Sequence, residues 1–211
     1  MTRILLVSGS TREESLHAAA LRTAARLVPP EITAARYDGL RDLPAFVPGA
    51  VTAHLAVTAL RGAVRAADAV LFCTPQYAGS LPGSLKNLLD WLVDGGELDG
   101  KPAAWLSVAP PGQDEGAYST LETVLAHGNA RLLRPACIRT PLTLASVDAR
   151  GLVTDPSLHM ALRDMLEALT RAIAAAARPR QPSWQAHSSL YPVIQRQDAS
   201  TPTFRTWRPP S

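Results

Sequence analysis

Apolar and polar positions follow two different periods along the chain. Short apolar runs predict buried strands at 3–7, 32–37, 69–73 and 103–108, with a fifth strand inside 130–138. Between these runs, apolar residues recur every three or four positions, which predicts helices over 15–27, 52–67, 84–93, 115–127 and 158–177. Strand and helix therefore alternate five times, and this order predicts a parallel sheet with helices on both faces.

The predicted fold is α/β with three layers, in which a five-stranded parallel sheet lies between two layers of helices. The five strand–helix units match the flavodoxin-like strand order 2-1-3-4-5. In that order the winding reverses between strands one and three. Open sheets of this kind bind ligands at the carboxyl ends of the strands beside such a point. The loops after strands one and three are therefore the first candidates for a functional site.

One domain accounts for most of the chain. The chain has 211 residues, 46% of them hydrophobic, and residues 1–178 suffice for one good hydrophobic core. Residues 179–211 contain six prolines and no helical or strand period, which is typical of a linker or a disordered tail. The same tail holds four of the eleven aromatic residues, which favours packing against the body or a partner subunit. Both interpretations of the tail stay open.

The net charge of +3 does not indicate a nucleic-acid partner. Four of the 21 basic residues and one of the 18 acidic residues lie in 179–211, so residues 1–178 carry 17 of each sign. The sequence has neither a basic stripe nor a known nucleic-acid motif. It also lacks the roughly 18 consecutive apolar residues of a membrane span and a recognisable secretory signal, so we expect a cytoplasmic protein.

Neither the cysteines nor the histidines indicate a metal or dithiol site. Cys73 and Cys137 are the only cysteines, and both are expected as small core residues in predicted strands. The five histidines are scattered along the chain without the spacing of metal ligands. A Gly-x-Ser-x-Gly nucleophile elbow is also missing, so the sequence does not support Ser–His–Asp hydrolysis.

The first candidate site is the loop 8–15, which reads Ser-Gly-Ser-Thr-Arg-Glu-Glu-Ser and leads from a strand into a helix. The amino end of a helix exposes free N–H groups and a positive partial charge, and therefore attracts a phosphate. Ser10 and Ser15 add hydroxyl donors, and Arg12 adds a charged contact. The alternative is an ordinary helix cap by a serine. The glycines and the lysine of a Walker loop are missing.

The second candidate site is the loop after the third strand, which reads Pro-Gln-Tyr-Ala-Gly-Ser over residues 75–80. The prolines fix the backbone, Gly79 lets main chain approach a ligand, and Tyr77 offers an aromatic surface. Four residues of the helix that follows are expected to have structural roles: Lys86, Asn87, Asp90 and Trp91.

These motifs resemble those of the NAD(P)H-dependent FMN reductase family. The family's first motif is Gly-Ser-x-Arg-x-x-Ser, and its second is close to Pro-Glu-Tyr-Asn-Gly-Ser-x-Pro-Gly-x-Leu-Lys-Asn-x-x-Asp-Trp. A weaker match is the loop 109–117 after the fourth strand, where Ala117 stands in place of the second glycine of the family's pair. Gln76 and Ala78 stand where the family usually has Glu and Asn.

The resemblance implies a noncovalent FMN cofactor, hydride supply by NADPH or NADH, and electron transfer to a small acceptor such as a quinone, an azo dye, a metal ion or free flavin. It also implies a homodimer or a homotetramer. Because the flavin carries out the chemistry in such enzymes, no catalytic acid–base residue is predicted. The implied cofactor contacts are Ser10, Arg12, Ser15, Pro75, Gln76, Tyr77, Ala78, Gly79, Ser80, Pro111, Gly112 and Gly116.

Two other functions stay open. A flavodoxin-type electron carrier would bind FMN without using a nicotinamide, but such carriers are typically acidic, whereas residues 1–178 are neutral. A relative that has lost its flavin would serve as a scaffold, and the departures at Gln76, Ala78 and Ala117 are compatible with that loss.

Overall fold

The computed structural model describes residues 2–50 and 54–177. Its strands are β1 (Thr2–Ser8), β2 (Ile32–Tyr37), β3 (Ala69–Cys73), β4 (Pro102–Ser107), β5 (Arg131–Leu132) and β6 (Ile138–Arg139). Its α-helices are α1 (Leu16–Leu27), α2 (Leu55–Ala66), α3 (Gly83–Gly95), α4 (Glu115–His127) and α5 (Pro156–Ala177). Short 3-10 helices are η1 (Gly39–Arg41), η2 (Arg134–Ala136) and η3 (Leu144–Ser146). The tail 179–211, with its predicted packing, lies outside the described residues.

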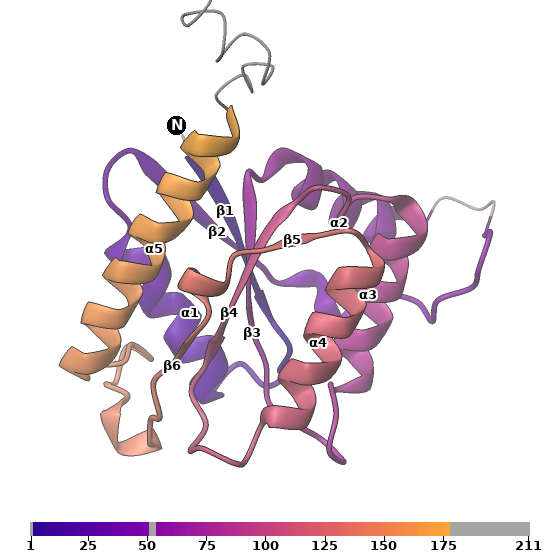
Figure 1. The fold of residues 1–211 in the computed structure, drawn as a ribbon. Coiled ribbons are helices and arrows are strands. Elements are labelled where there is room, and N and C mark those ends of the chain that lie inside the picture. Colours follow the sequence, from indigo (N-terminus) through magenta and orange to yellow (C-terminus); the bar gives the residue numbers. More distant parts are fainter. Residues whose placement is uncertain (1, 51–53, 178–211) are drawn as a thin grey trace, which may run out of the picture. The chain divides into compact units, whose positions relative to one another are not determined.

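The strands form a parallel sheet in the order β2-β1-β3-β4-β5 (Figure 1). This order confirms the predicted flavodoxin-like fold. The central strand β1 pairs with β2 on one side and with β3 on the other, and Ser8 at its carboxyl end lies opposite Cys73. Because these two strands end in register, the loops that follow them leave the sheet at the same edge.

The sheet is covered on both faces, as Figure 1 shows, with α1 and α5 on one side and α2, α3 and α4 on the other. Successive side chains of a strand point to opposite faces. In β3, Val70 and Phe72 pack with the α2–α4 side, whereas Leu71 and Cys73 pack with the α1–α5 side. All five residues of β3 are buried. A strand that is buried on both faces reads as a continuous apolar run, which explains the sequence pattern.

The fifth strand is in the predicted place but is broken in two. The pieces β5 and β6 both pair with β4, and η2 separates them. Pro135 lies inside η2, where its ring fixes φ and removes the N–H that a strand would need. The expectation that Cys137 lies within a strand is wrong, because this residue ends η2 and is only half-buried. Burial still raises the pKa of its thiol to about 11.

The structural roles predicted for α3 are confirmed. Lys86 Nζ lies 2.6 Å from Asp90 Oδ1, an i,i+4 ion pair on one turn of the helix. The side-chain amide of Asn87 donates to the carbonyl of Pro44 at 2.9 Å, and the indole N–H of Trp91 donates to the same oxygen at 3.0 Å. These residues therefore hold the loop after η1 against α3.

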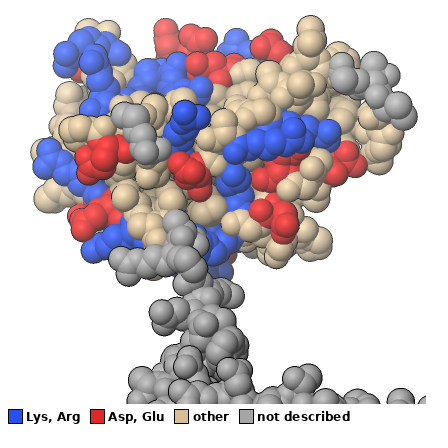
Figure 2. Space-filling model, turned by 90° about the horizontal axis from the view of Figure 1, so that it is seen from above, with Lys and Arg blue, Asp and Glu red and all other residues tan. Residues whose placement is uncertain are grey.

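Basic and acidic side chains are interspersed on the face at the amino ends of the strands (Figure 2). That face is opposite the edge at which the loops after β1 and β3 emerge. Among the described residues, the structure contains no helix with the length and apolar character that a membrane crossing requires.

Candidate functional site

The loops after β1 and β3 meet directly where they leave the sheet. The N–H of Gly9 donates to the carbonyl of Cys73 at 2.9 Å. A Cβ atom at Gly9 would lie 2.5 Å from the Cβ of Thr74 and closer still to its hydroxyl oxygen. Only glycine fits at such a crossing. The two loops that the sequence singles out are therefore in contact through their first residues.

Serine hydroxyls organise the loop between β1 and α1. Ser10 Oγ accepts a hydrogen bond from the N–H of Arg12 at 3.2 Å. Ser15 Oγ accepts one from the N–H of Ala18 at 3.1 Å, so Ser15 is the N-cap of α1. The helix cap by a serine, which the sequence analysis gave as the alternative to a phosphate site, is therefore present. A capping hydroxyl uses a lone pair, and its own hydrogen stays available for another acceptor.

The three predicted residues of this loop differ in exposure. Ser10 is buried, Ser15 is half-buried, and Arg12 is exposed. Within the described part of the chain, the guanidinium of Arg12 has no hydrogen bond or ion pair. A guanidinium without a protein partner at the amino end of α1 adds to the positive potential of that helix end.

A two-residue β-turn forms the loop after β3. The backbones of Tyr77 and Ser80 exchange two hydrogen bonds of 2.9 Å each. Between them, φ is 48° at Ala78 and 76° at Gly79, and two positive φ values are typical of a type I′ turn. Tyr77 is 52% exposed, and a Cβ atom at Gly79 would meet nothing within 4 Å. The turn therefore presents backbone and an aromatic ring to open space.

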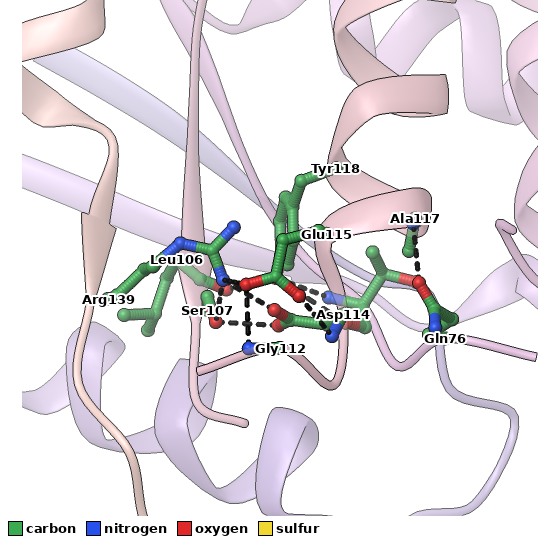
Figure 3. Close-up of polar contacts among 10 residues, drawn as sticks. Gln76, Leu106, Ser107, Gly112, Asp114, Glu115, Ala117, Tyr118 and Arg139 are labelled. Atoms are coloured by element: carbon green, nitrogen blue, oxygen red, sulfur yellow. Dashed lines mark hydrogen bonds and ion pairs between the residues drawn. The ribbon is translucent and has the colours of Figure 1, made fainter. Parts of the chain in front are cut away.

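The turn is attached to the amino end of α4. The side-chain oxygen of Gln76 accepts a hydrogen bond from the N–H of Ala117 at 3.0 Å (Figure 3). A Cβ atom at Gly116 would lie 3.0 Å from the carbonyl carbon of Gly79 and closer still to its oxygen. Gln76 therefore caps α4 from another loop, and Gly116 is required because two backbones touch.

The remaining predicted residues lie in the same region but are less constrained. Ser80 Oγ lies 3.1 Å from the hydroxyl oxygen of Thr120 in α4. Pro111 and Gly112 are exposed at the tip of the loop after β4. Gly112 has a φ of 87°, and a Cβ atom there would meet nothing within 4 Å. The loops after β3 and β4 thus lie side by side, and they are joined where Gln76 and Gly79 contact the first turn of α4.

A buried ion pair at the base of the third loop was not predicted from the sequence. Figure 3 shows Asp114, Arg139 and Ser107 pointing toward one another. The side chain of Asp114 is 1% exposed, and its carboxylate lies 2.5 Å from Nη1 of Arg139. The same carboxylate accepts a hydrogen bond of 2.6 Å from Ser107 Oγ. Asp114 precedes α4 and reads as an ordinary helix cap, but its side chain makes no capping bond. Its partner lies 25 residues later, beyond the reach of a local pattern.

Tyr118 connects the ends of two strands beneath the same loop. Its hydroxyl donates to the carbonyl of Leu106 at 2.5 Å and accepts from the N–H of Thr74 at 3.3 Å. The guanidinium of Arg139 lies 5.6 Å from the centre of its ring. Burial raises the pKa of this phenol well above its usual value, and burial likewise raises the pKa of the Cys73 thiol. Both groups are therefore neutral; the phenol holds the strand ends together, and the thiol packs in the core.

Glu115 closes the third loop on itself. Its carboxylate accepts hydrogen bonds from the N–H of Gly112 at 2.7 Å and from the N–H of Asp114 at 3.3 Å. The bond from Gly112 is the main reason why the pKa of this exposed carboxyl lies below its usual value. The Glu115 carboxylate also lies 3.7 Å from Nη1 of Arg139. The N–H groups of this loop are therefore already used within it.

His17 is a neutral imidazole in the first turn of α1. Burial lowers its pKa to about 4, although the nearby carboxylate of Asp114 opposes that shift. Its Nε2 is buried and has no hydrogen-bond partner among the residues that the structure describes. Within residues 2–50 and 54–177, no cluster of His, Cys, Asp and Glu could hold a metal ion.

Comparison with known proteins identifies relatives of this chain. The family model for NADPH-dependent FMN reductases matches residues 2–138. An NAD(P)H-dependent FMN reductase of Pseudomonas aeruginosa is 32% identical over 173 residues, which cover 79% of this chain and 92% of that protein. A quinone reductase of Escherichia coli is 31% identical over 105 residues, which cover 47% of this chain and 56% of that protein. An NADPH azoreductase of a Bacillus species is 31% identical over 126 residues, covering 59% and 67%.

Solved structures agree with the sequence relatives. The flavoenzyme FerB of Paracoccus denitrificans, an NAD(P)H:(acceptor) oxidoreductase, superposes with a TM-score of 0.67 at 25% identity, covering 83% of this chain and 98% of that one. An NADH:FMN oxidoreductase in its apo form has a TM-score of 0.59 at 20% identity, covering 87% and 93%, and supports the fold alone. From its sequence, its strand order and these relatives, the chain belongs to the NADPH-dependent FMN reductase family.

Proposed function

We propose that this protein holds FMN on the loops after β1, β3 and β4 and uses it to pass electrons from NAD(P)H to a quinone or a similar small acceptor. Membership of the family makes the chain an oxidoreductase that uses FMN and NAD(P)H. The convergence of the three loops at the carboxyl edge of β1, β3 and β4 carries the proposal for the site. The quinone acceptor is supported by relatives named as quinone reductases.

The loop between β1 and α1 suits the phosphate of FMN. Ser10 and Ser15 supply hydroxyl groups, and Arg12 supplies a guanidinium that has no partner among the described residues. The first N–H groups of α1 lie at the same place, where the helix dipole favours an anion. Because the Ser15 oxygen already caps α1, only its hydrogen is left for a phosphate oxygen.

The loops after β3 and β4 suit the flat ring system of the flavin. Pro75 to Ser80 on one side, and Pro111, Gly112 and Gly116 on the other, supply the contacts that we propose. The open space beyond Gly79 and Gly112 leaves room for a ring to approach main chain. The side-chain oxygen of Gln76 binds α4, so Gln76 acts on the flavin by positioning its loop.

Bound FMN would supply the hydride-accepting and electron-donating chemistry. The chain's own residues bind and orient that group and keep the three loops in place. Tyr118 and Cys73 are buried with raised pKa values, and the pKa of His17 is lowered to about 4, so none of the three is suited to exchange a proton at neutral pH. We therefore assign no acid–base residue.

The test is steady-state oxidation of NADPH and of NADH by the purified protein with added FMN and 1,4-benzoquinone. The proposal requires quinone-dependent oxidation of at least one nucleotide. An electron carrier would bind FMN but would not oxidise either nucleotide, and a flavin-free scaffold would not bind FMN. Either result would reject the proposal.

A titration of FMN into the Arg12→Ala variant tests the phosphate end separately. The loss of one charged contact should weaken FMN binding about ten- to hundredfold. Arg163→Ala is the matched control, because Arg163 is an exposed arginine on α5 and belongs to none of the three loops. Riboflavin, which lacks the phosphate, should bind parent and variant with similar dissociation constants. Equal FMN affinity in parent and Arg12→Ala would remove Arg12 from the site.

We further propose that the enzyme acts in the cytoplasm as a homodimer or a homotetramer. Reduced nicotinamides are available in that compartment, and the resemblance to the family implies such oligomers. Light scattering coupled to size-exclusion chromatography measures the oligomeric mass, and a monomer at micromolar concentration would contradict this part.

A further inference from the structure

Positive charge is concentrated in a cavity that is lined by the loop between β1 and α1 itself, through Ser10 to Glu14, and that extends to the residues at the end of β2. Five arginines line this cavity of about 620 Å³: Arg12, Arg22, Arg36, Arg41 and Arg150. A second cavity, of about 390 Å³, shares three of these residues and adds Arg26. Residues 75–80 and 111–116 line neither cavity. This space therefore lies apart from the loops proposed for the flavin ring.

Together the two cavities are lined by six arginines and three carboxylates, a net charge of +3, which is one more than a dianionic flavin phosphate neutralises. The larger cavity is lined by five arginines against three carboxylates, and the smaller by four arginines against one. A phosphate monoester carries about two negative charges at neutral pH, and Arg12 with the amino end of α1 already meets it. Three arginines from separate elements line both cavities: Arg22, Arg36 and Arg150.

Two hydrogen bonds to backbone carbonyls fix the position of the Arg22 guanidinium in the cavity. Its Nε donates to the carbonyl of Gly151 at 3.0 Å, and its Nη1 donates to the carbonyl of Glu13 at 2.9 Å. Within the described part of the chain, Arg22 has no carboxylate partner. A Cβ atom at Gly151, where φ is 72°, would lie 2.9 Å from Nη2 of Arg22. Helix α1, the loop before it and the segment before α5 are thereby tied together around one guanidinium.

The other two shared arginines are neutralised only by exposed or local carboxylates. Arg36 lies 3.1 Å from Asp38, whose side chain is 73% exposed. Arg150 lies 3.1 Å from Asp148, two residues away in the same loop. Exposed pairs of this kind contribute little stability. A dianionic ligand with several oxygens can therefore take these guanidinium groups from their carboxylates, and guanidinium binds phosphate in a bidentate way.

The cavity also has an apolar side, so it suits more than an inorganic ion. Leu6, Leu21 and Leu40 line it together with the half-buried ring of Tyr37. An apolar wall beside a few charged groups is typical of a site for a nucleotide, whose flat base and phosphate need both.

We propose that this arginine-lined cavity binds the 2′-phosphate on the adenosine ribose of NADPH and makes the enzyme select NADPH over NADH; the proposal rests on the proposed function. The two nucleotides differ only in that phosphate. A carboxylate such as Asp38 accepts hydrogen bonds from hydroxyl groups and repels a phosphate, so alone it would favour the free ribose hydroxyls of NADH. The nearby Arg36 neutralises it, and Arg22 and Arg150 add the charge that a phosphate requires.

The first experiment compares kcat/KM for NADPH and NADH in the FMN-loaded enzyme with 1,4-benzoquinone. The parent should prefer NADPH by at least about tenfold. Arg36→Gln and Arg150→Gln should each lower kcat/KM for NADPH about ten- to hundredfold and leave that for NADH within about twofold. Arg163→Gln on α5 is the matched control and should change neither value. Equal losses with both nucleotides, a parent that prefers NADH, or weakened FMN binding in the variants would each overturn the proposal.

The second experiment separates this proposal from the proposed function. Isothermal titration calorimetry of the FMN-loaded protein with adenosine 2′,5′-bisphosphate and with 5′-AMP needs no turnover. The bisphosphate should bind more tightly, and Arg36→Gln should remove most of that difference. If the parent oxidises neither nucleotide, the proposed function fails, yet this binding difference still supports the cavity as a 2′-phosphate site. Equal binding of the two probes by the parent would overturn it.

Discussion

The contact between Gly116 and the turn after β3 gives a sharp test of how the site is held. Gly116 is the second residue of α4, and any side chain there would meet the backbone of Gly79. Gly62 lies inside α2, and a Cβ atom there would meet nothing within 4 Å. The same substitution, glycine to alanine in a helix, therefore has opposite expected effects at the two positions.

For Gly62→Ala we expect a gain of about 0.5–1 kcal/mol in the free energy of unfolding, because alanine restricts the unfolded chain and favours helix. For Gly116→Ala the same gain is opposed by the overlap with Gly79. Forcing extra atoms into a packed site costs about 1–3 kcal/mol, and here the obstacle is main chain, which cannot change rotamer. Gly116→Ala should therefore show a net loss of up to about 2.5 kcal/mol, and the two variants should differ by the overlap cost, about 1–3 kcal/mol.

Urea unfolding with and without FMN measures both consequences. A ligand that binds only the folded protein adds about 2.7 kcal/mol at one hundred times its dissociation constant. Parent and Gly62→Ala should show this gain at the same FMN concentration, whereas Gly116→Ala should lose most of it, since the displaced turn carries the proposed ring contacts. If Gly116→Ala matches Gly62→Ala in stability and keeps the FMN gain, the close approach of the two loops is not needed for binding.

Four further substitutions test three separate parts of the site. For His17, a folded-state pKa of about 4 against an ordinary 6.5 means that the unfolded chain takes up the proton first. The free energy of unfolding should therefore fall by up to about 3 kcal/mol from pH 6.5 to 4, and less in His17→Gln; equal slopes would contradict this. Ala78→Asn should raise stability by about 0.5–1 kcal/mol in urea, because asparagine tolerates positive φ better, and a loss would contradict the turn geometry. Asp114→Asn should cost about 1–3 kcal/mol and Glu115→Gln much less, and equal costs would show that burial of the ion pair is unimportant.

The layers and strand order follow from the sequence because they depend on period and chirality. A buried parallel strand is continuously apolar, and β3 is buried at every position. The structural roles predicted for Lys86 and Asp90 follow from the helical period too, and the two side chains form an ion pair because they lie on one turn of a helix. The break in the fifth strand depends on a single residue, Pro135, inside an otherwise acceptable strand pattern.

The polar groups that hold the loops were not predicted, because their partners lie on different elements. Asp114 and Arg139 are 25 residues apart, and Gln76 and Ala117 are 41 apart. Arg22 and Gly151 are 129 apart. A pattern along the sequence reports on neighbours within one helix or strand, whereas these contacts exist only after the sheet has brought its loops together.

The site therefore contains two kinds of residue: some are constrained by backbone conformation, and others by a buried charge. Residues of the turn after β3 act through backbone shape, so Ala78 can stand where the family usually has Asn, at a cost of about 1–2 kcal/mol in strain. Asp114 acts through a buried charge whose partners lie on β4 and β6, and a neutral side chain in its place would leave only the exposed carboxylate of Glu115, 3.7 Å away, to balance Arg139. The departures at Gln76 and Ala78 are therefore compatible with the proposed flavin site, and we expect the stricter requirement at the buried pair of Asp114 and Arg139.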